Sequence, residues 1–128
     1  MSAEASVSAY VTPNEVEIMV KMTIEQIEEK LRHVNAISDD NRTELLQLLA
    51  TLKDEVAELS ETQNEDAESI TGFTQLSTHE ATRQDKNPQL LQLSVEGLRS
   101  SVNGFETSHP RLSETVNSIC HILSNMGI

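Results

Sequence analysis

The fold is decided by the C-terminal stretch, residues 90–128, which reads LLQLSVEGLRSSVNGFETSHPRLSETVNSICHILSNMGI. Its apolar residues form two seams that each step by four, three, four and three residues, the spacing that places side chains along one stripe of a helix. The first seam holds Leu91, Val95, Leu98, Val102 and Phe105, and the second holds Leu112, Val116, Ile119, Leu123 and Met126. Because the connection between them is short, we predict an antiparallel hairpin of helices over residues 89–106 and 110–126.

The residues Ser108, His109 and Pro110 mark the turn of this hairpin. A proline fits the first turn of a helix, where its missing N–H leaves no hydrogen bond unmade. The residue before a proline avoids helical geometry, so His109 is the natural N-cap of the last helix, with Ser108 as the rival. Near the end of the chain, Gly127 suits a helix stop. Conformational roles therefore explain these residues better than catalytic ones.

The hairpin carries little charge, since only five of residues 90–128 are Asp, Glu, Lys or Arg. Two helices with so much apolar surface cannot bury it against each other alone. The hairpin must pack on the N-terminal helices, on a second copy of the chain, or on a partner. We predict that the ten seam residues form an oligomer or partner interface and that the chain is a homo-oligomer.

The N-terminal half predicts two more helices, over residues 13–36 and 39–63. TPNE at 12–15 is a capping box with a proline at the first helical position, and TIEQ at 23–26 is a second capping box, so either can start the first helix. SDDN at 38–41 caps the second helix, whose heptad seam is Leu45, Leu49, Leu52, Val56 and Leu59. We expect one all-α domain over residues 12–128, a coiled-coil-like bundle of antiparallel hairpins, after a disordered tail at 1–11. Translation can start at Met1, Met19 or Met22.

Residues 64–88 show only a weak helical pattern, with Ile70, Phe73 and Leu76 as apolar points. Gly72 and the threonines beside it lower helix propensity by a few tenths to about 1 kcal/mol each. The pair Asn87-Pro88 marks a boundary, because the residue before a proline avoids helical geometry. The pattern is compatible with a short helix, a frayed extension of the preceding helix or a mobile connector, and we predict a partly ordered linker over residues 64–88.

The composition argues against several functions. With a net charge of −12, the chain would be repelled by nucleic-acid phosphates and by anionic membranes, and we expect neither as a direct partner.

A single cysteine, Cys120, cannot form an internal disulfide, which favours the cytoplasm. Cys120 and His121 are adjacent and would point about 100° apart on a helix, so they cannot act as a catalytic pair. The histidines at 33, 79, 109 and 121 lack metal-site spacing. We predict no catalytic, metal or cofactor site and no enzyme activity.

The tail FETSHPRLSETVNSICHILSNMGI, residues 105–128, resembles the end of a family of short bacterial proteins described as a domain of unknown function. Members of that family tend to finish with FE-x-x-HP-x-L and then an apolar helix ending in L-S-x-MGI. The matching positions here are Phe105, Glu106, His109, Pro110, Leu112, Leu123, Ser124, Met126, Gly127 and Ile128. The stretches IEEKL at 27–31 and NRTELLQLL at 41–49 are similar to the family's first two helices. The resemblance covers most of 22–62 and 88–128, implies no activity, and makes 1–21 and 64–87 additions to the family plan.

Two hypotheses about function follow from these patterns. The first is a non-enzymatic cytoplasmic interaction protein, a self-assembling adaptor or scaffold that binds itself or an unidentified protein. The alternative is an acidic decoy that occupies a basic groove of a nucleic-acid-binding protein, because residues 54–68 contain seven acids and no base. The decoy needs its carboxylates in ordered rows, for which the candidates are Asp54, Glu55, Glu58, Glu61, Glu65 and Glu68.

Overall fold

A computed structural model describes residues 12–126, and this part of the chain holds five α-helices and no strand. The helices are α2 (Pro13–His33), α3 (Asp39–Leu59), α4 (Asn64–Thr82), α5 (Pro88–Ser101) and α6 (Pro110–Met126). The predicted all-α class is confirmed. The tail predicted to be disordered, residues 1–11, and the helix stop predicted at Gly127 lie outside the described residues.

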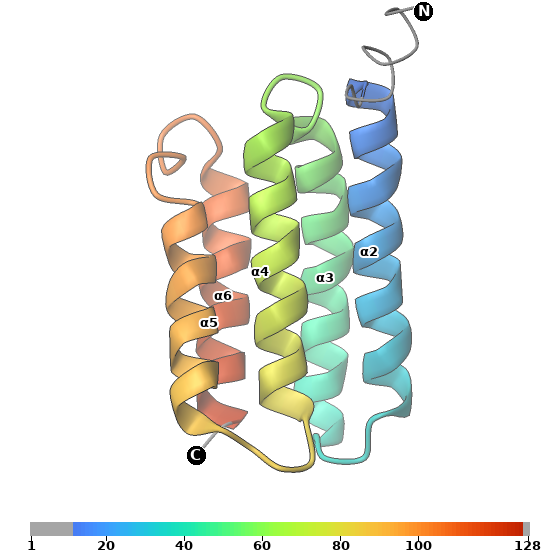
Figure 1. Cartoon of the computed structure of the whole chain (residues 1–128), viewed down its shortest axis with the longest axis vertical. Helices are drawn as coiled ribbons and strands as arrows, with labels where there is room; N and C mark the ends of the chain where they lie inside the picture. Colours follow the sequence, from blue (N-terminus) through green and yellow to red (C-terminus); the bar gives the residue numbers. More distant parts are fainter. Residues whose placement is uncertain (1–11, 127–128) are drawn as a thin grey trace, which may run out of the picture.

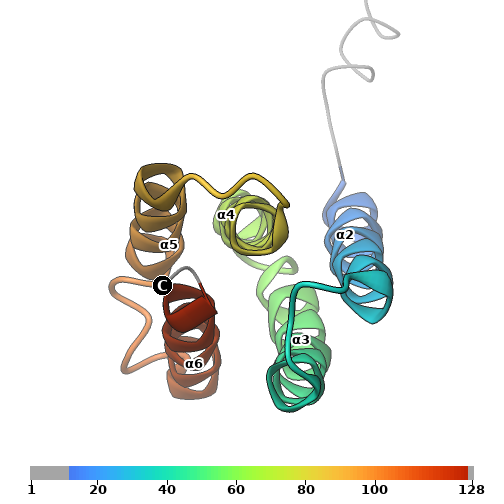
Figure 2. The same cartoon turned by 90° about the horizontal axis from the view of Figure 1, so that it is seen from below.

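The helices run alternately up and down, so that α2, α4 and α6 point one way and α3 and α5 the other (Figure 1). Seen along their axes they form two layers, with α5, α4 and α2 side by side in one and α6 and α3 in the other (Figure 2). The middle helix of the larger layer, α4, contacts all four of the other helices. It is therefore the element around which the bundle is assembled.

Side-chain caps explain where three of the helices begin. The Thr12 hydroxyl accepts a hydrogen bond from the Glu15 amide at 3.2 Å, and the Glu15 carboxylate accepts one from the Thr12 amide at 3.2 Å. This capping box starts α2, while TIEQ lies inside the helix. Ser38 caps α3 through the Asn41 amide at 3.2 Å, and Asn87 caps α5 through the Leu90 amide at 3.1 Å.

The predicted linker over residues 64–88 is wrong, because Asn64–Thr82 form a helix. No side chain caps its start, since Gln63 makes no capping hydrogen bond. Its buried side chains are mostly small: Ala67, Ile70, Thr71, Thr74, Ser77, Thr78, Glu80 and Ala81. Small side chains let a central helix approach several neighbours closely. Tertiary packing thus stabilises a helix whose own propensity is weak.

Three predicted helix ends lie too far along the chain. Helix α2 ends at His33 instead of residue 36, because Val34 is extended with ψ of 135°. Helix α3 ends at Leu59 instead of residue 63, where the chain turns and the Gln63 amide donates to the Leu59 carbonyl at 2.8 Å. Helix α5 ends at Ser101 instead of residue 106, since the chain turns at Gly104 with φ of 94°, a conformation that glycine adopts readily.

One apolar core draws side chains from all five described helices. At the edge of this core, the buried carboxylate of Glu28 on α2 receives a hydrogen bond from the Lys53 ammonium on α3 at 3.1 Å. Pairing matters here because an isolated buried charge is costly. The pair fixes how α2 and α3 lie against each other.

Candidate interaction surface

The ten seam residues predicted as an interface lie in the core of the single chain. Nine of them are buried, and Met126 is partly buried against the same core. Helix α5 packs on α4, α6 packs on α3, and α5 and α6 pack on each other. The chain's own helices therefore cover the hairpin seams. Side chains so enclosed offer no surface to a second copy, and the predicted interface has to be corrected to a core.

Ser108, His109 and Pro110 lead directly into the last helix. Pro110 is the first residue of α6 and His109 directly precedes it, with its carbonyl accepting from the Ser113 amide at 3.2 Å, as an N-cap carbonyl does. The His109 ring meets the Phe105 ring edge-on with centroids 5.4 Å apart, and its Nδ1 lies 3.0 Å from the Ser108 hydroxyl oxygen. These contacts hold the turn. Within residues 12–126, no three His, Cys, Asp or Glu side chains converge on a metal position.

Cys120 is fully buried, with its Sγ 3.8 Å from the Val95 carbonyl oxygen. Burial raises the pKa of this thiol from 9.0 to about 11, against a smaller opposing effect of the Arg99 charge. The thiolate is the reactive form of cysteine, so a thiol that keeps its proton at neutral pH is a poor nucleophile. The position agrees with a packing role for Cys120.

The acidic run is divided between two helices. Asp54, Glu55 and Glu58 lie on α3, whereas Glu65 and Glu68 lie on α4 after the chain has reversed direction. Glu61 lies in the turn between them. The acids of this run therefore lie on two antiparallel helices and the turn between them.

Large exposed apolar side chains gather on one layer of the bundle. In the part of the chain that the structure describes they are Ile18, Met19 and Met22 on α2, Phe73 and Leu76 on α4, and Leu90 and Leu93 on α5. Their exposed fractions run from 36% for Phe73 to 57% for Leu93. None lies on α3 or α6. We call these seven residues the outer apolar face.

Two helical glycines of this layer have different surroundings. At Gly97 on α5, an added Cβ would lie 2.3 Å from the Phe73 ring on α4, so the glycine makes room for that ring. At Gly72 on α4, nothing lies within 4 Å of the position that a Cβ would take. The contacts within the chain explain the first glycine and leave the second unexplained.

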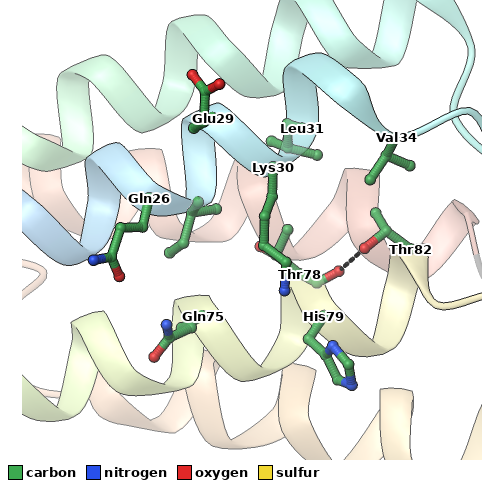
Figure 3. Close-up of a pocket in the computed structure, with 10 residues that line it drawn as sticks. Gln26, Glu29, Lys30, Leu31, Val34, Gln75, Thr78, His79 and Thr82 are labelled. Atoms are coloured by element: carbon green, nitrogen blue, oxygen red, sulfur yellow. Dashed lines mark hydrogen bonds between the residues drawn. The ribbon is translucent and has the colours of Figure 1, made fainter.

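A groove of about 390 Å³ separates α2 from α4 (Figure 3). Gln26 and Gln75 lie on opposite walls, and the Lys30 side chain extends from α2 toward α4 (Figure 3). Gly72 lines two smaller hollows that continue the groove along α4. The Thr78 hydroxyl at its floor is buried and has no hydrogen-bond partner within the described structure. The groove is thus lined by amide, ammonium, imidazole and carboxylate groups, the last from Glu29.

Sequence reasoning missed the outer apolar face because it followed the apolar seams. In the sequence, Met19 and Met22 are possible translation starts, and Phe73 and Leu76 are isolated apolar points in a segment with a weak helical pattern. The available signal was the presence of large apolar residues outside a seam, as at Ile18 and Leu93.

The family described as a domain of unknown function, DUF4404, matches residues 45–128. The chain belongs to this family. The DUF4404 match begins at Leu45 in α3 and runs through the whole of α4, so the interpretation of residues 64–87 as an addition to the family plan is wrong. Residues 1–21 lie outside the match, and so does IEEKL at 27–31.

No curated protein and no solved structure matches the chain. Among the described helices, none combines the length and apolarity that a membrane span requires.

Proposed function

We propose that this DUF4404 protein is a non-enzymatic interaction protein, an adaptor or small scaffold, that binds through its outer apolar face. The uneven distribution of exposed apolar side chains carries this proposal, since all seven lie on α2, α4 and α5 and none on α3 or α6. Exposed apolar side chains scattered singly are ordinary, but a group of them on neighbouring helices is typical of a binding site. We therefore assign the binding surface to the three helices of the larger layer and not to the predicted C-terminal seams.

The chemistry of the bundle supports the same proposal. The buried thiol of Cys120 has a raised pKa, and the His109 ring is used in a turn. The α2–α4 groove offers shape and mixed polarity to a protein surface. We place the protein in the cytoplasm, because a chain with a single cysteine forms no internal disulfide.

Site-specific photo-crosslinking in the cells of origin tests the proposal. A benzophenone side chain is placed at Met22, Leu76 or Leu93 on the outer apolar face, and at the exposed positions Gln47 on α3 or Asn117 on α6 as matched controls. We expect discrete protein adducts from the first three positions and none from the controls. Equal adduct formation at both sets, or none at either, would contradict a binding role for this face. Circular dichroism confirms that each variant is folded.

A further inference from the structure

Gly72 lies on α4 next to Phe73 of the outer apolar face, and no contact within the described chain explains why this position is a glycine. It lies inside α4 and is exposed, and no atom beyond its chain neighbours and the nearby backbone of its own helix lies within 4 Å of the position that a Cβ would take. A helix with a glycine in its interior is less stable than the same helix with an alanine there, because glycine loses more backbone freedom on folding. A glycine is useful where another backbone approaches closely. Within the described chain nothing does so, which points to contact with another molecule.

Charged residues are ordered along α4 about this glycine. Glu65, Gly72 and His79 are exposed at seven-residue intervals, which places them on one line along the helix. Glu68 lies on the N-terminal side of Gly72, where it lines a hollow with Met19 of α2. Lys30 of α2 lines the hollow on the other side with His79. Neither Glu68 nor Lys30 has an ion-pair partner within residues 12–126.

This order makes the face self-complementary. Helices α2 and α4 point the same way (Figure 1), so Glu65 and Glu68 lie on one side of Gly72 and Lys30 and His79 on the other. The one carboxylate that lines the groove beside Lys30, Glu29, is within ion-pair distance of Arg32 and His33 on its own helix. A two-fold axis that lies in the plane of the face, tilted slightly from a right angle to α4, reverses the direction of a second copy and lets the two α4 helices cross. It then places each acidic half against a basic half. A C2 contact of this kind uses the same patch on both subunits.

We propose that the outer apolar face binds a second copy of this chain in a two-fold antiparallel dimer, with the two α4 helices crossing at Gly72. Glu65 then faces His79 of the second copy, since both lie seven residues from Gly72, and the Lys30 side chain, which extends from α2 toward α4 (Figure 3), reaches toward Glu68 of the second copy. Met22 and Leu76 lose their exposure to water in the contact. This inference rests on the proposed function and specifies its partner.

Replacing Gly72 separates dimer formation from folding. In the full-length protein, Gly72→Leu puts a good helix former into α4 and should raise the thermal midpoint of the monomer by a few degrees. The same side chain should block the helix crossing and raise the dimer dissociation constant at least tenfold, measured by sedimentation equilibrium. Gln47→Leu, at an exposed site on α3, is the matched control and should leave the dissociation constant unchanged.

Charge reversal tests the direction of the second copy. Glu68→Lys and Lys30→Glu should each weaken the dimer severalfold, and the double variant should restore it. A wild-type chain that sediments as a monomer at 0.5 mM, or a dimer unaffected by Gly72→Leu, would overturn the inference. The proposed function would survive that result if crosslinks from Met22, Leu76 and Leu93 led to a different protein. It would fall separately if those positions gave no adducts.

Discussion

Helix α4 and the C-terminal hairpin of α5 and α6 each have a place in the structure that differs from the one their sequence predicts. The hairpin has regular aliphatic seams and little charge, which predicts a surface in search of a partner, yet its seams are enclosed by the chain's own helices. Helix α4 has few aliphatic residues, which predicts a linker, yet it contacts every other described helix. The comparison teaches that regular seams of large aliphatic residues indicate a buried core. A helix at the centre of that core is indicated by small residues at the seam positions.

The largest expected effect comes from a charge in the hairpin seam. Leu123 is fully buried, so Leu123→Asp should lower the free energy of unfolding by more than about 4 kcal/mol and unfold the chain. Ser118→Asp, at an exposed site of α6, should stay folded. Circular dichroism at 222 nm during urea titration measures both. A folded but dissociated Leu123→Asp chain would return the hairpin to the role of an interface.

A cavity in α4 should have the next largest effect. Ile70 is fully buried, and Ile70→Ala should lower the free energy of unfolding by about 2–5 kcal/mol because it removes packed methyl groups and leaves a void. Leu76→Ala removes a similar volume from a side chain that is 45% exposed and should cost less than about 1 kcal/mol. Chemical denaturation compares the two. Equal, small effects would mean that residues 64–88 behave as a linker after all.

The buried thiol provides a pH-dependent test of the hairpin core. Its pKa of about 11 means that the folded thiol keeps its proton while an unfolded thiol ionises from about pH 9. The resulting stabilisation is complete below pH 9 and is lost as the pH rises toward 11. At pH 8, Cys120 should react with a disulfide reagent only after unfolding. Ser118→Cys in a Cys120→Ala background should react at once. A fast reaction of native Cys120 would show that the hairpin is open.

The smallest effects distinguish two buried hydroxyls of α4. Thr74 donates to the Ile70 carbonyl at 2.7 Å, whereas the Thr71 hydroxyl has no partner in the described structure. Thr74→Val should lower the free energy of unfolding by about 0.5–1.5 kcal/mol, while Thr71→Val should be neutral or slightly stabilising. Thermal unfolding of the two isosteric variants decides this. A larger loss at Thr71 would show that its hydroxyl is hydrogen-bonded in solution.

Much of the fold was predictable because its signals are local. Capping at Thr12, Ser38 and Asn87 and the turn at His109-Pro110 depend on neighbouring residues alone. Helix α4 has its own seam, Ala67, Ile70, Thr74, Ser77 and Ala81, with the usual steps of three and four. Three of these five residues are alanine or serine and one is threonine, so their burial cannot be predicted before the four surrounding helices are known. The outer apolar face was missed for a related reason, since exposure depends on which seams the chain itself covers.

The odd number of described helices has a mechanical consequence. Helix α2 begins at one end of the bundle and α6 finishes at the other, separated by the length of a 21-residue helix, about 30 Å (Figure 1). Tension applied across residues 12–126 would therefore act along the helix axes. The first and last helices would have to slide lengthwise past α3 and α4, breaking many side-chain contacts together rather than one after another. We therefore expect the described bundle to resist tension that is applied along its helix axes.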